Sequence, residues 1–94
     1  MRNSVISPWL YNYIKQRGYA MNVTFRITIH GWWMAFEAAS GLMGKPERME
    51  DFEAFEVEDI VLYINKNVLA NNLKNSLLDI YIEGYGRYMV EILN

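Results

Sequence analysis

Short runs in which apolar and polar residues alternate constrain the fold of this chain more than any other feature. The clearest run spans residues 23–29, where every second side chain is apolar. Shorter runs of the same kind occupy residues 77–83 and 88–92. A period of two is typical of β-strands that bury one face and expose the other. The alternation therefore predicts a chain whose structure consists mainly of strands.

Residues 32–40 are compatible with two structures. Met34, Phe36 and Ala38 alternate with smaller or charged residues, which favours a strand. The same residue types also favour a helix. Gly31 follows directly after the strand at 23–30 and indicates a hairpin or a bulge. Strand is the preferred interpretation, with helix left open.

Further strands are predicted in the second half of the chain. Residues 53–57 form a short strand, Glu58 and Asp59 reverse the chain, and residues 60–64 follow as a strand that is apolar on both faces. A strand without a polar face is expected at the centre of a sheet. Residues 40–51 contain two glycines, a proline and several charges, and are predicted to form a loop.

Two short helices are expected. Ser7 followed by Pro8 is typical of a helix start, and Gly18 is a typical stop, which places the first helix at 8–17. Asn65 is predicted to cap the second. Residues 1–94 are thus predicted to form one α+β domain, a compact β-rich sandwich of mostly antiparallel or mixed strands with two short helices. Its core is expected to contain the many aromatic and methionine side chains.

Composition excludes several classes of function. The sequence has no cysteine, so thiolate metal sites and cysteine nucleophiles are excluded. The net charge is −2 and the basic residues are scattered, which argues against a nucleic-acid partner. No apolar run is long enough to cross a membrane and no export signal is recognisable, so a cytoplasmic protein without a membrane is expected.

The sequence His30-Gly31-Trp32-Trp33 places the one histidine beside two of the three tryptophans. Adjacent strand residues point to opposite faces, so at most one of the two indoles enters the core. The other is expected to be exposed or covered by a partner, because tryptophan is enriched at interfaces. This turn is predicted to be a binding or interface site, with no catalytic residue and no cofactor.

Four segments resemble the HesB-like family, the A-type iron–sulfur cluster biogenesis proteins. They are the helix ending at Gly18 with the strand from Val23, the hairpin at 55–66, the helix-to-strand step at 73–81, and Glu83-Gly84-Tyr85-Gly86-Arg87-Tyr88-Met89. The resemblance covers nearly the whole chain and implies a β-rich sandwich that associates as a dimer or higher oligomer. In that family three cysteines hold iron or a cluster. The matching positions here are Trp32, Glu83 and Tyr85, none of which supplies a thiolate.

The resemblance therefore implies a non-enzymatic, cysteine-free HesB-like domain linked to iron–sulfur cluster assembly through protein contacts or as a homodimer. One alternative is a small-ligand domain with an aromatic pocket near Trp32 and Trp33, joined by His30 and Tyr85. Another is a metal site built from His30, Glu83 and carboxylates of the acidic run at 47–59. One imidazole and one carboxylate are too few for a structural site, so no metal is predicted.

Overall fold

A computed structural model describes residues 2–30 and 34–93, and for residues 2–3, 27–30, 34–38 and 72 it describes the backbone alone. The elements in this part of the chain are, in order, β1 (Arg2–Val5), α1 (Pro8–Lys15), β2 (Ala20–His30), β3 (Met34–Met43), the 3-10 helix η1 (Met49–Asp51), β4 (Phe52–Val57), β5 (Ile60–Asn65), α2 (Lys66–Asn72), β6 (Leu77–Ile82) and β7 (Gly86–Leu93).

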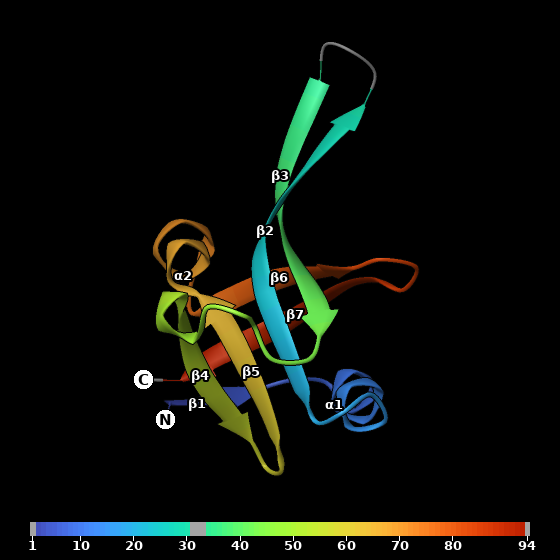
Figure 1. The fold of residues 1–94 in the computed structure, drawn as a ribbon, viewed down its shortest axis with the longest axis vertical. Helices are drawn as coiled ribbons and strands as arrows, with labels where there is room; N and C mark the ends of the chain where they lie inside the picture. Colours follow the sequence, from blue (N-terminus) through green and yellow to red (C-terminus); the bar gives the residue numbers. More distant parts are fainter. Residues whose placement is uncertain (1, 31–33, 94) are drawn as a thin grey trace.

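The strands form a closed barrel in the order β1-β4-β5-β2-β3-β6-β7, with β7 pairing back to β1 (Figure 1). Strand β1 runs parallel to β4, β2 parallel to β5, and β3 parallel to β6, while the remaining neighbours are antiparallel. The predicted strand-rich α+β fold with a mixed sheet and two short helices is confirmed. The strands form one barrel, where the sequence analysis expects the two packed sheets of a sandwich.

The β2–β3 hairpin is longer than the barrel wall that it joins. The two strands pair from Met21 and Met43 out to His30 and Met34. Strand β2 pairs with β5 only over Ala20–Val23, so the outer half of the hairpin extends beyond the barrel (Figure 1). Strand is thus the correct interpretation for residues 34–40.

Two predictions of where strands lie are wrong. Residues 40–43 belong to β3 and are not a loop, and Arg2–Val5 forms a strand for which none was predicted. Gly41 misled the prediction, because it marks close packing and not a turn. A Cβ atom at Gly41 would lie 2.8 Å from Met21 Sδ and 3.2 Å from Ile80 Cγ2. Glycine leaves room there for two core side chains that a larger residue would have to displace.

Each helix begins directly after its predicted N-cap residue. Ser7 Oγ accepts a hydrogen bond from the Leu10 amide at 3.3 Å, and Asn65 Oδ1 accepts one from the Asn67 amide at 2.8 Å. Helix α1 ends at Lys15, two residues before the predicted end, and Gly18 then takes a φ of +106°. The two helices lie on opposite sides of the core (Figure 1).

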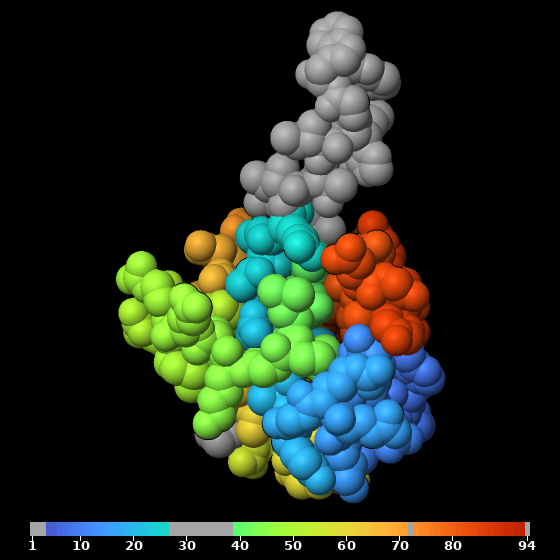
Figure 2. Space-filling view, turned by 45° about the vertical axis from the view of Figure 1, so that its right-hand side comes forward, coloured from blue at the N-terminus to red at the C-terminus, as the bar shows by residue number. Residues whose placement is uncertain are grey.

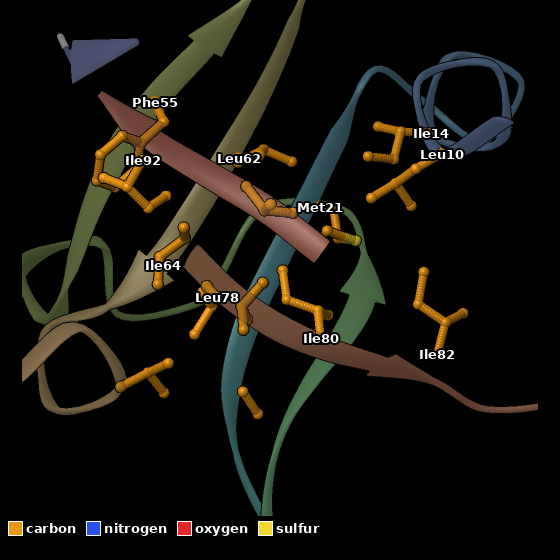
Figure 3. Close-up of a cluster of buried hydrophobic side chains, with 14 of the residues drawn as sticks. Leu10, Ile14, Met21, Phe55, Leu62, Ile64, Leu78, Ile80, Ile82 and Ile92 are labelled. Atoms are coloured by element: carbon orange, nitrogen blue, oxygen red, sulfur yellow. The ribbon is translucent and has the colours of Figure 1, made fainter. Parts of the chain in front are cut away.

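The core is mainly aliphatic. Figure 3 shows Leu, Ile and Met side chains from α1, β2, β5, β6 and β7 gathered in one cluster with Phe55. Among the residues whose burial is described, Phe55 and Tyr63 are the only buried aromatics. The expectation of an aromatic core is therefore wrong. Most of the described tyrosine and tryptophan rings lie at the surface or are only half-buried, and their arrangement there defines the candidate site.

Candidate functional site

The five predicted site residues have separate outcomes. Trp32 and Trp33 lie outside the described residues. His30 ends β2, where its backbone pairs with Met34. Glu83 is exposed, and its Oε2 atom lies 3.3 Å from Nη1 of Arg26. Tyr85 lies in the same turn but contacts helix α1, so the structure brings Glu83 and Tyr85 to different partners.

Tyr85 belongs to a cluster of four aromatic rings, the aromatic surface, made of Trp9, Tyr13, Tyr85 and Tyr88. Trp9 and Tyr13 come from α1, Tyr85 from the turn between β6 and β7, and Tyr88 from β7. Figure 2 shows these two segments meeting on one face of the molecule, α1 in blue and the β6–β7 segment in orange-red. Residues far apart in sequence thus form one site.

The rings of the aromatic surface pack in specific geometries. Trp9 stacks on Tyr13 with ring centroids 5.0 Å apart and on Tyr88 with centroids 4.5 Å apart, at interplanar angles of 17° and 6°. Tyr85 meets the ring of Tyr13 edge-on at 4.8 Å. Such arrangements are favourable beyond the burial of area. Trp9 and Tyr85 nevertheless remain 40% and 49% exposed, so ring surface is available to a ligand.

Local sequence explains how the rings are presented. Trp9 and Tyr13 are four residues apart and therefore lie on one side of α1, while Leu10 and Ile14, with the same spacing, enter the core. On the opposing segment, the Tyr88 hydroxyl donates a hydrogen bond to the Tyr85 carbonyl at 2.9 Å. The turn that carries Tyr85 has Gly84 at a φ of +86°, a conformation that glycine adopts without strain.

A cation completes the site. The guanidinium carbon of Arg17 lies 3.7 Å from the centroid of the Tyr13 ring, and Nη1 donates to the Tyr13 carbonyl at 3.1 Å. The attraction between the cation and the ring holds Arg17 in place. Beside it lies a depression of about 300 Å³, a volume suited to a small ligand. It is lined by Trp9, Asn12, Tyr13, Gln16, Arg17 and Tyr85.

The lining determines what the depression can do chemically. The exposed parts of the aromatic rings offer apolar surface, Arg17 offers positive charge, and Asn12 and Gln16 offer amide groups. No carboxylate, imidazole or thiol belongs to this lining. These groups suit binding by stacking and hydrogen bonds better than proton transfer or nucleophilic attack.

On the neighbouring side of α1, a polar contact joins the helix to the turn between β4 and β5. The Tyr11 hydroxyl donates a hydrogen bond to Asp59 Oδ1, and Lys15 Nζ lies 3.8 Å from Asp59 Oδ2. The hydrogen bond raises the pKa of Tyr11 and lowers the pKa of Asp59. This contact fixes the helix that carries Trp9 and Tyr13.

Metal ligation has no geometric support in the part of the chain that the structure describes. Within it, no three His, Asp or Glu side chains lie close enough together to hold an ion. A second depression, of about 290 Å³, is lined by Asp51, Asn65, Lys66 and Asn67 at the start of α2. Lys66 Nζ donates there to the Glu50 carbonyl at 2.9 Å, a contact that ties η1 to the helix.

The sequence analysis missed most of the aromatic surface. It gave Trp9, Tyr13 and Arg17 no part in a site. The spacing of Trp9 and Tyr13 was an available signal, because side chains four residues apart on a helix are neighbours. Nothing in the sequence indicated that Tyr85 and Tyr88 would lie against them.

A family model described as the CC/Se motif containing family matches residues 3–89. The chain belongs to this family. The matched segment includes all four rings of the aromatic surface. The 94 residues of this family member include no cysteine. Searches of curated proteins and of solved structures found no match. Among the described residues, no helix of this family member is long and apolar enough to cross a membrane.

Proposed function

We propose that this member of the CC/Se motif containing family is a non-enzymatic binding domain whose ligand site is the aromatic surface. The observation that carries the proposal is the depression of about 300 Å³ between α1 and the β6–β7 turn, lined by partly exposed rings. Rings held in place by stacking lose little freedom when a ligand binds, which favours affinity.

The proposal retains an aromatic ligand pocket and Tyr85 from the sequence analysis and changes the pocket's location. Trp9 and Tyr13 take the role that the sequence analysis gave to Trp32 and Trp33. Support for a non-enzymatic role comes from the chemistry of the lining, in which rings, amides and one guanidinium stand where catalytic sites have ionisable acids or bases.

We also retain the HesB-like relationship, with its link to iron–sulfur cluster assembly, as a proposal. It is supported by the order of short helix, strands, short helix and C-terminal hairpin. Gly84 and Gly86 flank Tyr85 as the family pattern requires, with Glu83 and Tyr85 standing at two cysteine positions. In this proposal the chain takes part by contact and not by holding a cluster.

The binding role is tested with a neutral planar probe, indole-3-acetamide, followed by ¹H–¹⁵N correlation spectra. A ligand of this size in a shallow site is expected to bind with a Kd of about 1 mM. Shifts should concentrate in residues 9–17 and 83–88. Trp9→Ala should remove them, whereas Trp9→Phe, which retains a ring, should preserve most of the binding. Shifts spread evenly over the barrel, or none at several millimolar probe, would disprove the ligand site.

A second candidate function is self-association through the outer face of β1, β7 and β6. Val5 and Met89 are each 50% exposed on this face, and Leu77 and Leu93 are also exposed. On the paired strands Glu91 lies opposite Val5 and Leu77, and Asp79 lies opposite Met89. The face therefore mixes apolar and charged side chains, as protein interfaces commonly do. Sedimentation at micromolar concentration tests the homodimer. Met89→Glu should dissociate it, and a monomer at all concentrations would exclude it.

A further inference from the structure

We propose that the ligand of the aromatic surface is a planar aromatic molecule that carries an anionic group, with its ring against Trp9 and Tyr85 and its charge on Arg17. This inference rests on the proposed binding function and names the class of ligand. The depression supplies both parts of the recognition, exposed apolar ring surface and a cation beside it.

Charge at the site is unbalanced. Arg26, Arg48 and Arg87 each form an ion pair with a carboxylate at 3.0 to 3.4 Å. Arg17 forms none with any described residue, and no carboxylate lines its depression. Among the arginines whose side chains are described, Arg17 is thus the one whose charge is left for an external anion.

Arg17 is also held in an orientation suited to this role. Its guanidinium lies over the Tyr13 ring and donates from Nη1 to the Tyr13 carbonyl at 3.1 Å. A guanidinium has five N–H donors, so this single bond leaves donors for a carboxylate or phosphate. Because the group is already fixed by the ring, little side-chain freedom is lost when an anion binds.

The amides on the same helix extend the polar side of the site. Asn12 and Gln16 are exposed in α1 and at its C-cap, and both line the depression. Their side chains form no hydrogen bond with a described residue. Neutral donors next to a cation strengthen selection for an anion without adding a competing negative charge.

The test compares three probes that share one indole ring, namely indole-3-acetate, indole-3-acetamide and tryptamine. The protein is titrated with each at low salt, and residues 9–17 and 83–88 are followed by NMR. Indole-3-acetate should bind about tenfold more tightly than indole-3-acetamide, the effect of one charge-assisted hydrogen bond, and tryptamine more weakly than both. Raising the salt concentration should weaken only the binding of the acetate.

Substitution of Arg17 identifies the residue responsible. Arg17→Gln should reduce the tenfold preference to about one, because it should lower the affinity for indole-3-acetate much more than the affinity for indole-3-acetamide. Arg48→Gln is the matched control: it removes the same charge from an exposed arginine that has its own ion pairs, and the preference should persist. A merely structural role of Arg17 would instead lower the affinity for acetate and acetamide equally, which would overturn the proposal.

Phosphate is distinguished from carboxylate with AMP and adenosine. Tighter binding of AMP than of adenosine, lost in Arg17→Gln, supports a phosphate-bearing ligand. Equal binding of AMP and adenosine, together with a preference for indole-3-acetate, supports a carboxylate. Equal affinity for all three indole probes would overturn the anionic ligand and leave the binding site standing, whereas no binding of any ring probe would overturn both.

Discussion

The interior of the barrel and the aromatic surface use large side chains in opposite ways. Inside, Leu, Ile and Val fill the space with Phe55 as the one aromatic ring below 2% exposure among the described residues. Outside, Trp9, Tyr13, Tyr85 and Tyr88 stack on one another while two of them keep more than a third of their surface exposed. The interior is closed to ligands, and the surface cluster is open to them.

Packing explains this division. A small barrel has an interior just wide enough for side chains, and branched aliphatic groups from neighbouring strands fill it in layers. The planar rings of the aromatic surface lie instead where helix α1 meets the β6–β7 turn, outside these layers. The difference teaches that most of the aromatic rings whose burial is described lie at or near the surface, while aliphatic side chains fill the core.

The largest expected effect lies in the interior. Phe55→Ala leaves a cavity at a fully buried position and should lower the free energy of unfolding by about 3–5 kcal/mol. Phe55→Leu retains most of the volume and should cost less than about 1.5 kcal/mol. Chemical denaturation measures both. Similar losses for the two variants would show that the interior is not closely packed.

The next largest loss of stability is expected when volume is added next to the core. Gly41→Ala places a methyl group against Met21 and Ile80 and should cost about 1–3 kcal/mol. A double-mutant cycle with Met21→Ala checks the cause, because the shortened side chain removes the nearest contact and should make the Gly41 substitution less costly. Additive losses would contradict the close approach of these residues.

Trp9→Ala tests the surface side of the comparison. Because the indole is 40% exposed, its removal should cost about 1–2 kcal/mol of unfolding free energy, well below the loss for Phe55→Ala, and should abolish binding of indole-3-acetamide. Denaturation and NMR titration give the two values. A stability loss as large as that of Phe55→Ala would show that Trp9 stabilises the fold as much as a fully buried core residue does.

The smallest effect concerns the contact between Tyr11 and Asp59. Their hydrogen bond lowers the pKa of Asp59 from its ordinary 3.8 and raises that of Tyr11 from its ordinary 10.0. The stabilisation is therefore complete between about pH 4 and pH 10. It decreases as the pH falls through the lowered pKa of Asp59 or rises through the raised pKa of Tyr11.

Tyr11→Phe should accordingly be less stable than the native chain at neutral pH, and the difference should shrink below pH 4. Thermal melting from pH 2 to pH 8 measures this difference. Asn12→Ala, an exposed change on the same helix, should show no such pH dependence. A constant difference across the whole range would contradict the charge-assisted bond.

Local sequence was sufficient for elements whose signals lie within a few residues. Ser7 and Asn65 capped their helices as predicted, and Leu78, Ile80 and Ile82 are buried on one face of β6. Alternation and capping depend on neighbouring residues alone, so they can be read without the fold. The candidate site was predicted only in part, because Tyr85 belongs to it while Glu83 pairs with Arg26 away from the rings.

The sequence by itself determined a strand-rich domain with two short helices, and it excluded cysteine chemistry. Only the tertiary structure decided that β1 pairs with both β4 and β7 to close a barrel, that Gly41 is a packing residue, and that Tyr85 and Tyr88 meet Trp9. The physical reason is distance along the chain. Strand periodicity and helix caps are local, whereas barrel closure and the contact between α1 and the β6–β7 rings join residues more than fifty positions apart. No local pattern specifies which distant partner each will meet.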